Sequence, residues 1–418
     1  MTFRGFCHFA LFAIKIMAKN IKRRRKPLQR MPRVAILLES AYEHSRGLLR
    51  GIMKYVRLYG PWGLHIISGG KGDQRLPLVE QWKATGIIAR VPNEKVARSI
   101  VSANLPTVLF DPLAPFLAPK HPLSRCCRCF CDNRHIGQLA AEHFSEQKFE
   151  HFAFVPNRLQ TNWATERFEA FREHLAQFGK KITVYPIPSE AECDWGIEFK
   201  RIIPWLRRLP KPAAVFTPDD LRGRQVLDAC LIANIKVPHQ LAVLGVANDR
   251  EVCETTTPPL SSIAVDTEAA GFAAAEMLDG LMRGTFSEQR EFIYHAKEVV
   301  RRGSAEAVSF DDPLILQALE FIRINSGFSI RVTDIAKHLK LSRRTVEIHF
   351  KNILGHSVLE AIHKVRIESI RKLVADTGTP FGRIASLSGL ESATHLGEIF
   401  KAEFGMTMSE YREQKADD

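Results

Sequence analysis

The chain has 418 residues and is 45% hydrophobic, which is too long for one ordinary domain and sufficient for more than one buried core. Its net charge is +13, but residues 1–33 hold ten Lys or Arg and no acid, residues 34–312 sum to about +1, and residues 313–418 sum to +2. The composition therefore excludes a single small domain, and the basic total is weak evidence for nucleic-acid binding by the body of the chain.

Residues 1–32 are predicted to be a basic, disordered leader. Lys15 interrupts their short apolar run, and the basic cluster Arg23–Lys26 follows the run instead of preceding it. This order differs from a secretory signal, and the run is too short to span a bilayer. Translation starting at Met17 or Met31, or a basic arm that touches DNA or a membrane, remain alternatives.

Residues 33–302 alternate short apolar runs with amphipathic stretches, a pattern typical of parallel sheets with crossover helices. One series ends near Asp111 and another begins near His151, so we expect two similar lobes with a ligand cleft between them. The predicted strands are 34–38, 64–68, 86–89, 107–110, 151–155, 182–185, 213–217 and 241–245. The predicted helices are 46–59, 136–147, 165–177, 197–209 and 223–233.

Proline-rich segments predict where the chain passes between lobes. Pro112–Pro122 is expected to be irregular and to lie near the first crossing, with the second crossing near Pro258–Ile263. Residues 303–312 are predicted to be a linker. Residues 313–414 show only helical periodicity, so we expect a separate all-helical domain there.

Eight cysteines are present, four of them in the run from Cys126 to Cys131. This run lacks paired C-x-x-C knuckles and sits where a strand should begin, so we predict no metal site there or elsewhere. Nothing indicates a disulfide framework, which favours a reducing cytoplasm.

Residues Val332–Lys351 have the pattern of a helix-turn-helix. A short helix containing Ala336 is followed by a turn and by a second helix that begins after Ser342. Similar residues recur around Ile384 and Phe400, and a long amphipathic helix connects the two units. Two recognition helices at a fixed spacing could enter successive major grooves of DNA.

The segments DIAKHLKLSRRTVEIHFKNILG, IASLSGL and IFKAEFGMTMSEYR resemble the AraC/XylS family of transcription regulators over about 100 residues. The resemblance implies a double helix-turn-helix that binds double-stranded DNA. Leu390 and Met408 depart from its pattern, and Gly397 weakens the second recognition helix by roughly 1 kcal/mol relative to alanine. The first unit should therefore dominate specificity. The predicted DNA-binding residues are Arg343, Arg344, Thr345, Glu347, Ser392, Thr394, His395 and Glu398.

Polar side chains at successive strand ends predict a sugar site, because carboxylates and arginine bind adjacent hydroxyls while an aromatic ring covers the apolar face. Loop Asp and Asn residues can also simply cap helices. The predicted ligand-binding residues are Ser40, Tyr42, Asp132, Trp163, Arg167, Asp219, Asp220, Asn248 and Asp249.

The phrases LAVLGVANDREV and PPLSSIAVDTEAAG resemble the LacI/GalR and periplasmic sugar-binding fold from about Arg33 to Arg302. The resemblance implies a two-lobed sensing domain in which Arg167, Asp220 and Asp132 bind sugar hydroxyls. Together with the AraC-like half, it is similar to regulators of xylose operons. Ala247 departs from that family, which usually has an aspartate there that contacts the sugar. This departure argues against xylose itself, and the expected ligand is a pentose or a related sugar.

These patterns together predict a cytoplasmic, sugar-controlled transcription regulator. It is expected to be a homodimer that contacts RNA polymerase if it activates transcription, without membrane association, cofactor or enzymatic activity. The alternatives are a sugar-processing enzyme and a sugar-binding protein of a transport system. The chain has no P-loop, G-x-S-x-G or H-E-x-x-H motif, which argues against the enzyme.

Overall fold

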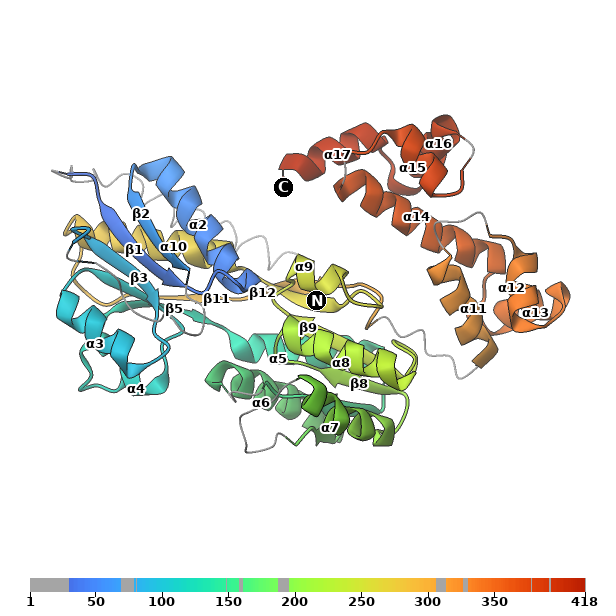
Figure 1. Ribbon diagram of the computed structural model, residues 1–418, viewed down its shortest axis with the longest axis horizontal. Helices are drawn as coiled ribbons and strands as arrows, with labels where there is room; N and C mark the ends of the chain where they lie inside the picture. The colour runs from blue at the N-terminus through green and yellow to red at the C-terminus, as the bar shows by residue number, and fades with distance from the viewer. Residues whose placement is uncertain are drawn as a thin grey trace. The chain divides into compact units, whose positions relative to one another are not determined.

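The computed structural model divides into two compact units, residues 1–307 and 308–418, each of which is described by itself (Figure 1). It describes residues 30–417 except 69–78, 80, 148, 158–160, 187–194, 306–312, 326–329, 377 and 391. Most of the predicted leader and most of the predicted linker lie outside the described residues.

The first lobe of the N-terminal unit is built on a six-stranded parallel sheet with the order β11-β5-β4-β3-β1-β2. Its central strands β1, β3 and β4 are mostly apolar and almost fully buried, because helices cover both faces of the sheet. The strands are β1 (Arg33–Leu38), β2 (Gly63–Ser68), β3 (Gly86–Arg90), β4 (Thr107–Phe110), β5 (Cys127–Cys131) and β11 (Glu291–Tyr294).

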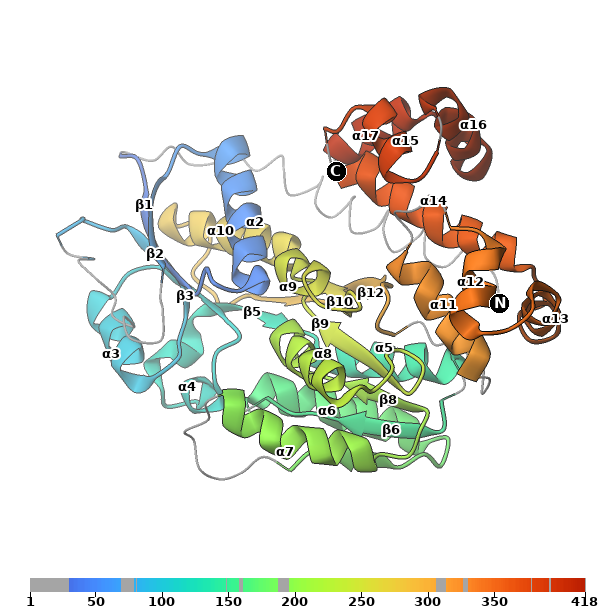
Figure 2. The same cartoon turned by 45° about the vertical axis from the view of Figure 1, so that its right-hand side comes forward.

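Helices α2 (Glu43–Tyr59) and α10 (Thr267–Met282) lie together on one face of this sheet, as Figure 2 shows. Their close approach needs glycine, because a Cβ on Gly51 would lie 2.0 Å from the Glu268 carbonyl oxygen and one on Gly271 would lie 2.0 Å from that of Leu48. Helix α3 (Glu94–Ala103) covers the other face, with α4 (Ala114–Leu117) and the 3-10 helix η1 (Pro122–Arg125) nearby.

The second lobe has a six-stranded sheet with the order β12-β10-β9-β8-β6-β7, in which only the pair of β12 and β10 is antiparallel. Its helices pack on both faces, with α5 and α6 on one face and α7 and α8 on the other. The strands are β6 (His151–Phe154), β7 (Ile182–Val184), β8 (Ala213–Phe216), β9 (Leu241–Val246), β10 (Ser261–Val265) and β12 (Ala296–Val300). The helices are α5 (Asn133–Glu146), α6 (Asn162–Ala176), α7 (Trp195–Arg208), α8 (Asp220–Ala233) and α9 (Arg250–Glu254).

The chain passes between the lobes three times, at Asp132 after β5, at Asp266 after β10, and at His295 between β11 and β12. Backbone hydrogen bonds join these crossings. The Asp132 amide donates to the Tyr294 carbonyl at 2.8 Å, and the Asp266 amide donates to the His295 carbonyl at 3.0 Å.

The predicted irregular crossing near Pro112–Pro122 was wrong, because this segment stays in the first lobe and contains α4 and η1. Proline is tolerated there because it stands in the first turn of each helix.

The cysteine run forms β5, where Cys127, Cys129 and Cys131 alternate with partly exposed residues and are all buried. Successive side chains on one face of a strand lie about 6–7 Å apart, so three of them cannot converge on one ion. Burial raises the pKa of all three thiols, to about 12 for Cys131. These cysteines fill the core of the first lobe.

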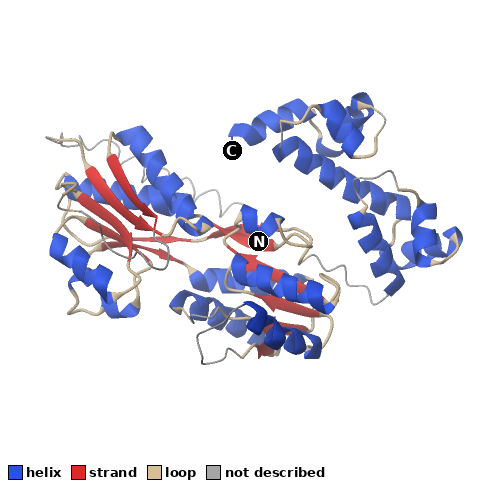
Figure 3. Cartoon of the chain, viewed as in Figure 1, coloured by secondary structure: helices blue, strands red, loops and turns tan. Residues whose placement is uncertain are grey.

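The C-terminal unit is helical throughout its described residues (Figure 3). It contains two hydrophobic cores: one surrounds Phe350 and the other surrounds Phe400, and the long helix α14 contributes to both. The helices are α11 (Pro313–Ile324), α12 (Val332–Leu339), α13 (Arg343–Leu354), α14 (Val358–Asp376), α15 (Phe381–Leu387), α16 (Ala393–Phe404) and α17 (Met408–Asp417). Among the described residues of the whole chain, no helix is both long and apolar enough to cross a membrane.

Candidate functional site

Asp220 is the centre of a buried polar cluster at the carboxyl ends of the second lobe's strands. It begins α8 just after β8, is 2% exposed, and accepts a hydrogen bond from Ser262 Oγ at 2.5 Å and one from the Asp249 amide at 2.7 Å. Burial raises the pKa of Asp220 to about 7, although the bonds from Ser262 and Asp249 oppose the shift. Burial also raises the pKa of the neighbouring Asp219, which caps α8.

The loop after β9 adds strained backbone to this cluster. Ala247 has a φ of 108° and Asn248 a φ of 53°, both in the region that favours glycine. The Asn248 amide donates to Ser262 Oγ at 2.9 Å, and its side-chain oxygen accepts from Arg302 at 2.7 Å. Ala247 is therefore held in a strained backbone conformation.

Asp111 organises a corresponding cluster at the end of β4 in the first lobe. One carboxylate oxygen contacts Arg90 at 2.8 Å and accepts from the Tyr294 hydroxyl at 2.7 Å; the other accepts from the Cys131 amide at 2.8 Å. Burial alone would raise the pKa of Asp111, but the imidazole of His44, 3.6 Å away, and the charge of Arg90 hold it well below its usual range. Burial lowers the pKa of His44.

Arg167, on α6, is 6% exposed and pairs with neutral groups. Its Nε donates to Asn133 Oδ1 at 3.0 Å and its Nη1 donates to the Pro218 carbonyl at 2.5 Å. The guanidinium lies over the ring of Trp163, 4.8 Å from the centroid. Among the described residues no carboxylate forms an ion pair with this largely desolvated guanidinium, and beside the partly exposed aromatic ring it is suited to donate hydrogen bonds to a polar ligand.

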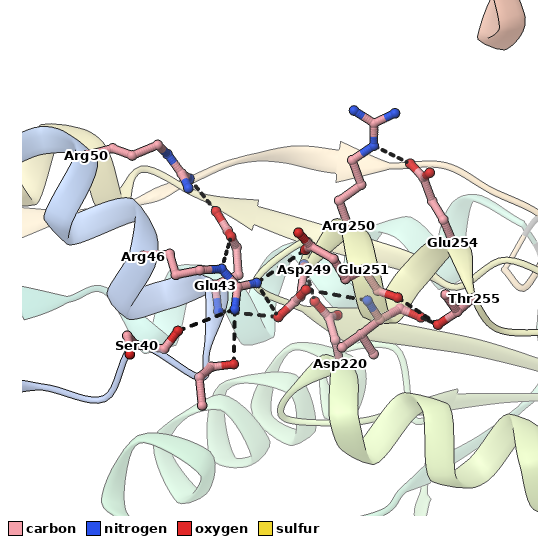
Figure 4. Close-up of polar contacts among 12 residues, drawn as sticks. Ser40, Glu43, Arg46, Arg50, Asp220, Asp249, Arg250, Glu251, Glu254 and Thr255 are labelled. Atoms are coloured by element: carbon pink, nitrogen blue, oxygen red, sulfur yellow. Dashed lines mark hydrogen bonds and ion pairs between the residues drawn. The ribbon is translucent and has the colours of Figure 1, made fainter. Parts of the chain in front are cut away.

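The two lobes are joined by a direct ion pair (Figure 4). Arg46 on α2 donates to Asp249 at 3.0 Å and contacts Glu251 at 3.3 Å, while the Glu43 amide donates to Asp249 at 3.3 Å. Asp249 also caps α9 through the Val252 amide at 3.4 Å. The carboxylate predicted to bind sugar is thus occupied by contacts that hold the lobes together.

The other predicted ligand residues are spread around these clusters. Tyr42 precedes α2 and is 39% exposed. Burial, followed by the charges of Glu39 and Asp219, raises its pKa. The Ser40 carbonyl accepts from Arg46 at 3.5 Å. Asp132 caps α5 and accepts from His295 Nδ1 at 3.1 Å.

Sequence reasoning missed Glu43, His44, Arg46, Arg90, Asp111, Ser262 and Tyr294. The only available signal was the position of Asp111 directly after a predicted strand, the same criterion that selected Asp219 and Asp220.

The predicted DNA-binding residues lie on α13 and α16. Ser342 accepts from the Thr345 amide at 3.1 Å and Ser392 accepts from the His395 amide at 3.1 Å, so the two helices start with equivalent caps. Both helices end at a left-handed glycine, Gly355 and Gly405.

The side chains available for base contacts differ between the two helices. Arg343 and Arg344 are exposed on α13, and Arg343 pairs with Glu347 at 2.8 Å. On α16, Thr394, His395 and Glu398 are exposed, with 3.8 Å between His395 and Glu398. Helix α13 therefore offers two arginines and α16 offers none. Because arginine binds both guanine and phosphate, α13 has the greater capacity for these contacts.

Two family models match the chain: a periplasmic binding protein-like domain over residues 141–305 and a helix-turn-helix domain over residues 335–414. Relatives are similar over nearly the whole chain. The xylose operon regulatory protein of Haemophilus influenzae is 26% identical over 392 residues, which cover 91% of this chain and 98% of the relative. The xylose operon regulatory protein of Escherichia coli K12 is 26% identical over 387 residues, which cover 91% of this chain and 97% of the relative.

A solved structure of a xylose-binding transcription activator, xylR, superimposes with a TM-score of 0.77 and 25% identity, covering 93% of this chain and 99% of the other. A transcriptional regulator CelR in complex with cellobiose matches with a TM-score of 0.54 and 19% identity over 70% of this chain and 90% of its own, which supports the fold alone. The predicted resemblances and fold class are confirmed.

Proposed function

We propose that this chain, a ligand-controlled DNA-binding transcription regulator and not an enzyme, responds to a pentose of the xylose type bound between the two lobes of its periplasmic binding protein-like domain. The Arg167–Trp163 pair is the observation that carries the proposal. A sugar offers hydroxyls to the guanidinium and an apolar face to the indole.

The acids around this pair supply the remaining acceptors. Asp219 and Asp220 begin α8, and the Pro218 carbonyl that Arg167 contacts immediately precedes them. Ser40, Tyr42, Asp132, Asn248 and Asp249 complete the proposed set, with Asp249 acting mainly through lobe closure. A pentose is favoured because two relatives that match over most of their length are regulators of a xylose operon.

The proposed regulation is a population shift between lobe arrangements. A sugar that binds more tightly when the lobes are closed shifts the population toward the closed form, by an amount set by its difference in affinity for the closed and open forms. In a homodimer this shift alters the spacing of the two helix-turn-helix domains. The dimer, the contact with RNA polymerase in the case of activation, and the cytoplasmic location are parts of the same proposal.

The test is fluorescence anisotropy of DNA from the chain's own upstream region, at stated salt, with xylose, arabinose, ribose, glucose or no sugar. We expect specific binding that xylose or another pentose shifts several-fold. Arg167→Met should remove the sugar effect and leave sugar-free DNA binding intact. DNA binding that no pentose alters, with no pentose binding detected by calorimetry, would overturn the pentose assignment.

A further inference from the structure

We infer that Asp132, His135 and His295 form a binding site for one divalent transition-metal ion of the zinc class, located where the chain passes between the two lobes. Each side chain offers one ligand atom, and among the described residues these three atoms lie within 4.8 Å of one another. This inference goes beyond the proposed sugar response and does not depend on it, although both assign a role to Asp132.

The ligand types define the metal class. Two imidazoles and one carboxylate are borderline ligands that suit Zn²⁺, Co²⁺, Ni²⁺ or Fe²⁺, whereas Mg²⁺ and Ca²⁺ prefer oxygen alone. Three protein ligands leave a tetrahedral ion one open position for water or another small molecule. The cysteines of β5 do not contribute, because they are buried in the core of the first lobe.

An unsatisfied ring nitrogen is an independent observation in favour of the site. His135 Nδ1 is buried and has no hydrogen-bond partner among the residues that the structure describes. A buried polar atom without a partner costs about 1–3 kcal/mol. A histidine can bind a metal through either ring nitrogen, and coordination through Nδ1 would remove that cost. The rings of His135 and His295 already face each other edge to face with 6.0 Å between centroids.

The geometry needs only a small adjustment. Asp132 Oδ2 and His295 Nδ1 are 3.1 Å apart, close to the spacing of two ligands on one zinc ion with bonds of about 2.0–2.2 Å. The ion would replace the hydrogen bond between them, with the ring proton carried on Nε2 of the neutral imidazole instead of Nδ1. His295 has a side chain that is 57% exposed, so it can rotate to complete the site. Asp132 is held in place because its other oxygen caps α5 by accepting from the His135 amide at 3.0 Å.

The position links the ion to lobe movement. Asp132 and His135 belong to the crossing from β5 to α5, and His295 belongs to the crossing from β11 to β12. A metal bound by all three would join two of the three interlobe crossings by coordinate bonds, in addition to the backbone bond from Asp132 to Tyr294. The ion would therefore restrict rotation of one lobe against the other.

The experiment is calorimetric titration of the full chain, purified without a histidine tag and without sugar, with Zn²⁺ and separately with Mg²⁺. We expect one equivalent of Zn²⁺ and no Mg²⁺ binding at this site. His135→Gln and His295→Gln should each weaken Zn²⁺ binding by at least about tenfold, and the double variant should lose it. His363→Gln, at an exposed position on α14, is the matched control and should bind as wild type does.

Circular dichroism checks the fold of each variant. If His135→Gln does not fold, His295→Gln decides alone, because its side chain is exposed. Substitution with Co²⁺ provides a second measurement, since coordination by thiolates would give an intense sulfur-to-metal charge-transfer band that imidazole and carboxylate ligands do not give. No stoichiometric Zn²⁺ binding, binding retained in the double variant, or a thiolate band would each overturn the inference.

Discussion

Arg46 on α2 donates to Asp249 at the start of α9 at 3.0 Å, and this ion pair connects the two lobes although 203 residues separate its members. Asp249 is held from three sides, by Arg46, by the Glu43 amide and by its own capping bond to the Val252 amide. The carboxylate of Asp249 thus accepts bonds from the first lobe and caps α9 at the same time. The Arg46–Asp249 ion pair therefore stabilises the arrangement of the two lobes that the structure has.

Removing the interlobe ion pair should weaken ligand binding without removing a ligand contact. In Arg46→Met we expect sugar affinity to fall by about 1 kcal/mol, roughly fivefold in Kd, because the pair is only partly buried. Isothermal calorimetry measures the affinity. Arg98→Met, which breaks an exposed pair with Glu94 within α3, is the control. Equal affinities in both variants would mean that the pair does not favour the ligand-bound arrangement.

Arg167 should be essential for ligand binding and important for stability. Arg167→Met is expected to weaken sugar binding by about 1.5–3 kcal/mol, roughly 10- to 150-fold, because hydrogen bonds from a charged donor are lost. It also leaves Asn133 and the Pro218 carbonyl without this donor, so the unfolding free energy should fall. Arg172→Met, on the exposed side of the same helix, is the matched control for calorimetry and urea denaturation. Sugar affinity of wild-type strength in Arg167→Met would exclude it as a ligand.

The buried Asp220 predicts a dependence of stability on pH. Its pKa is about 7 in the folded protein and about 3.9 in an unfolded chain, so between these values the folded state retains a proton that the unfolded state releases. The unfolding free energy should therefore fall as pH rises from about 4 to about 7 and level off above that. Relative to wild type, Asp220→Asn should gain stability over the same interval, by up to about 4 kcal/mol.

Urea denaturation at several pH values measures this difference. Ser262→Ala is the informative second variant, because it removes a hydrogen bond that lowers the pKa of Asp220 and should extend the fall to higher pH. A constant difference between wild type and Asp220→Asn from pH 4 to 8 would show that the carboxyl titrates normally.

The backbone at Ala247 predicts a stabilising glycine. With φ at 108°, replacement by glycine relieves strain, so Ala247→Gly should raise the unfolding free energy by about 1 kcal/mol. Ala242→Gly, in the interior of β9, should instead lower it by about 0.5–1 kcal/mol. Thermal denaturation compares the two. Destabilisation of both variants to the same extent would indicate that Ala247 is not strained.

The two recognition helices should contribute unequally to DNA binding. Arg344→Ala on α13 is expected to cost about 1–3 kcal/mol of specific affinity, whereas His395→Ala on α16 should cost less because α16 offers no arginine. Anisotropy with the chain's own upstream DNA measures both, and Arg98→Ala in the sensing unit is the charge-matched control. A larger loss for His395→Ala would assign specificity to the second unit.

The sequence alone determined the local elements and the class of protein. The repeated pattern around Ser342 and Ser392 predicted two capped recognition helices, and apolar runs such as Val34–Leu38 predicted buried strands, because helix caps and hydrophobic periodicity are properties of neighbouring residues. Strands β10, β11 and β12 were not predicted.

Only the tertiary structure decided which distant residues meet. The bond between Asp111 and Tyr294 joins residues 183 positions apart, and the cluster of Asp132, His135 and His295 exists because two crossings lie side by side. It also decided that β5 returns to the first sheet, where strand order is set by pairing across the sheet. Periodicity reports how deeply a residue is buried within its own element. It contains no information about which strand end or crossing that element will face, because those partners are chosen by packing of the whole unit.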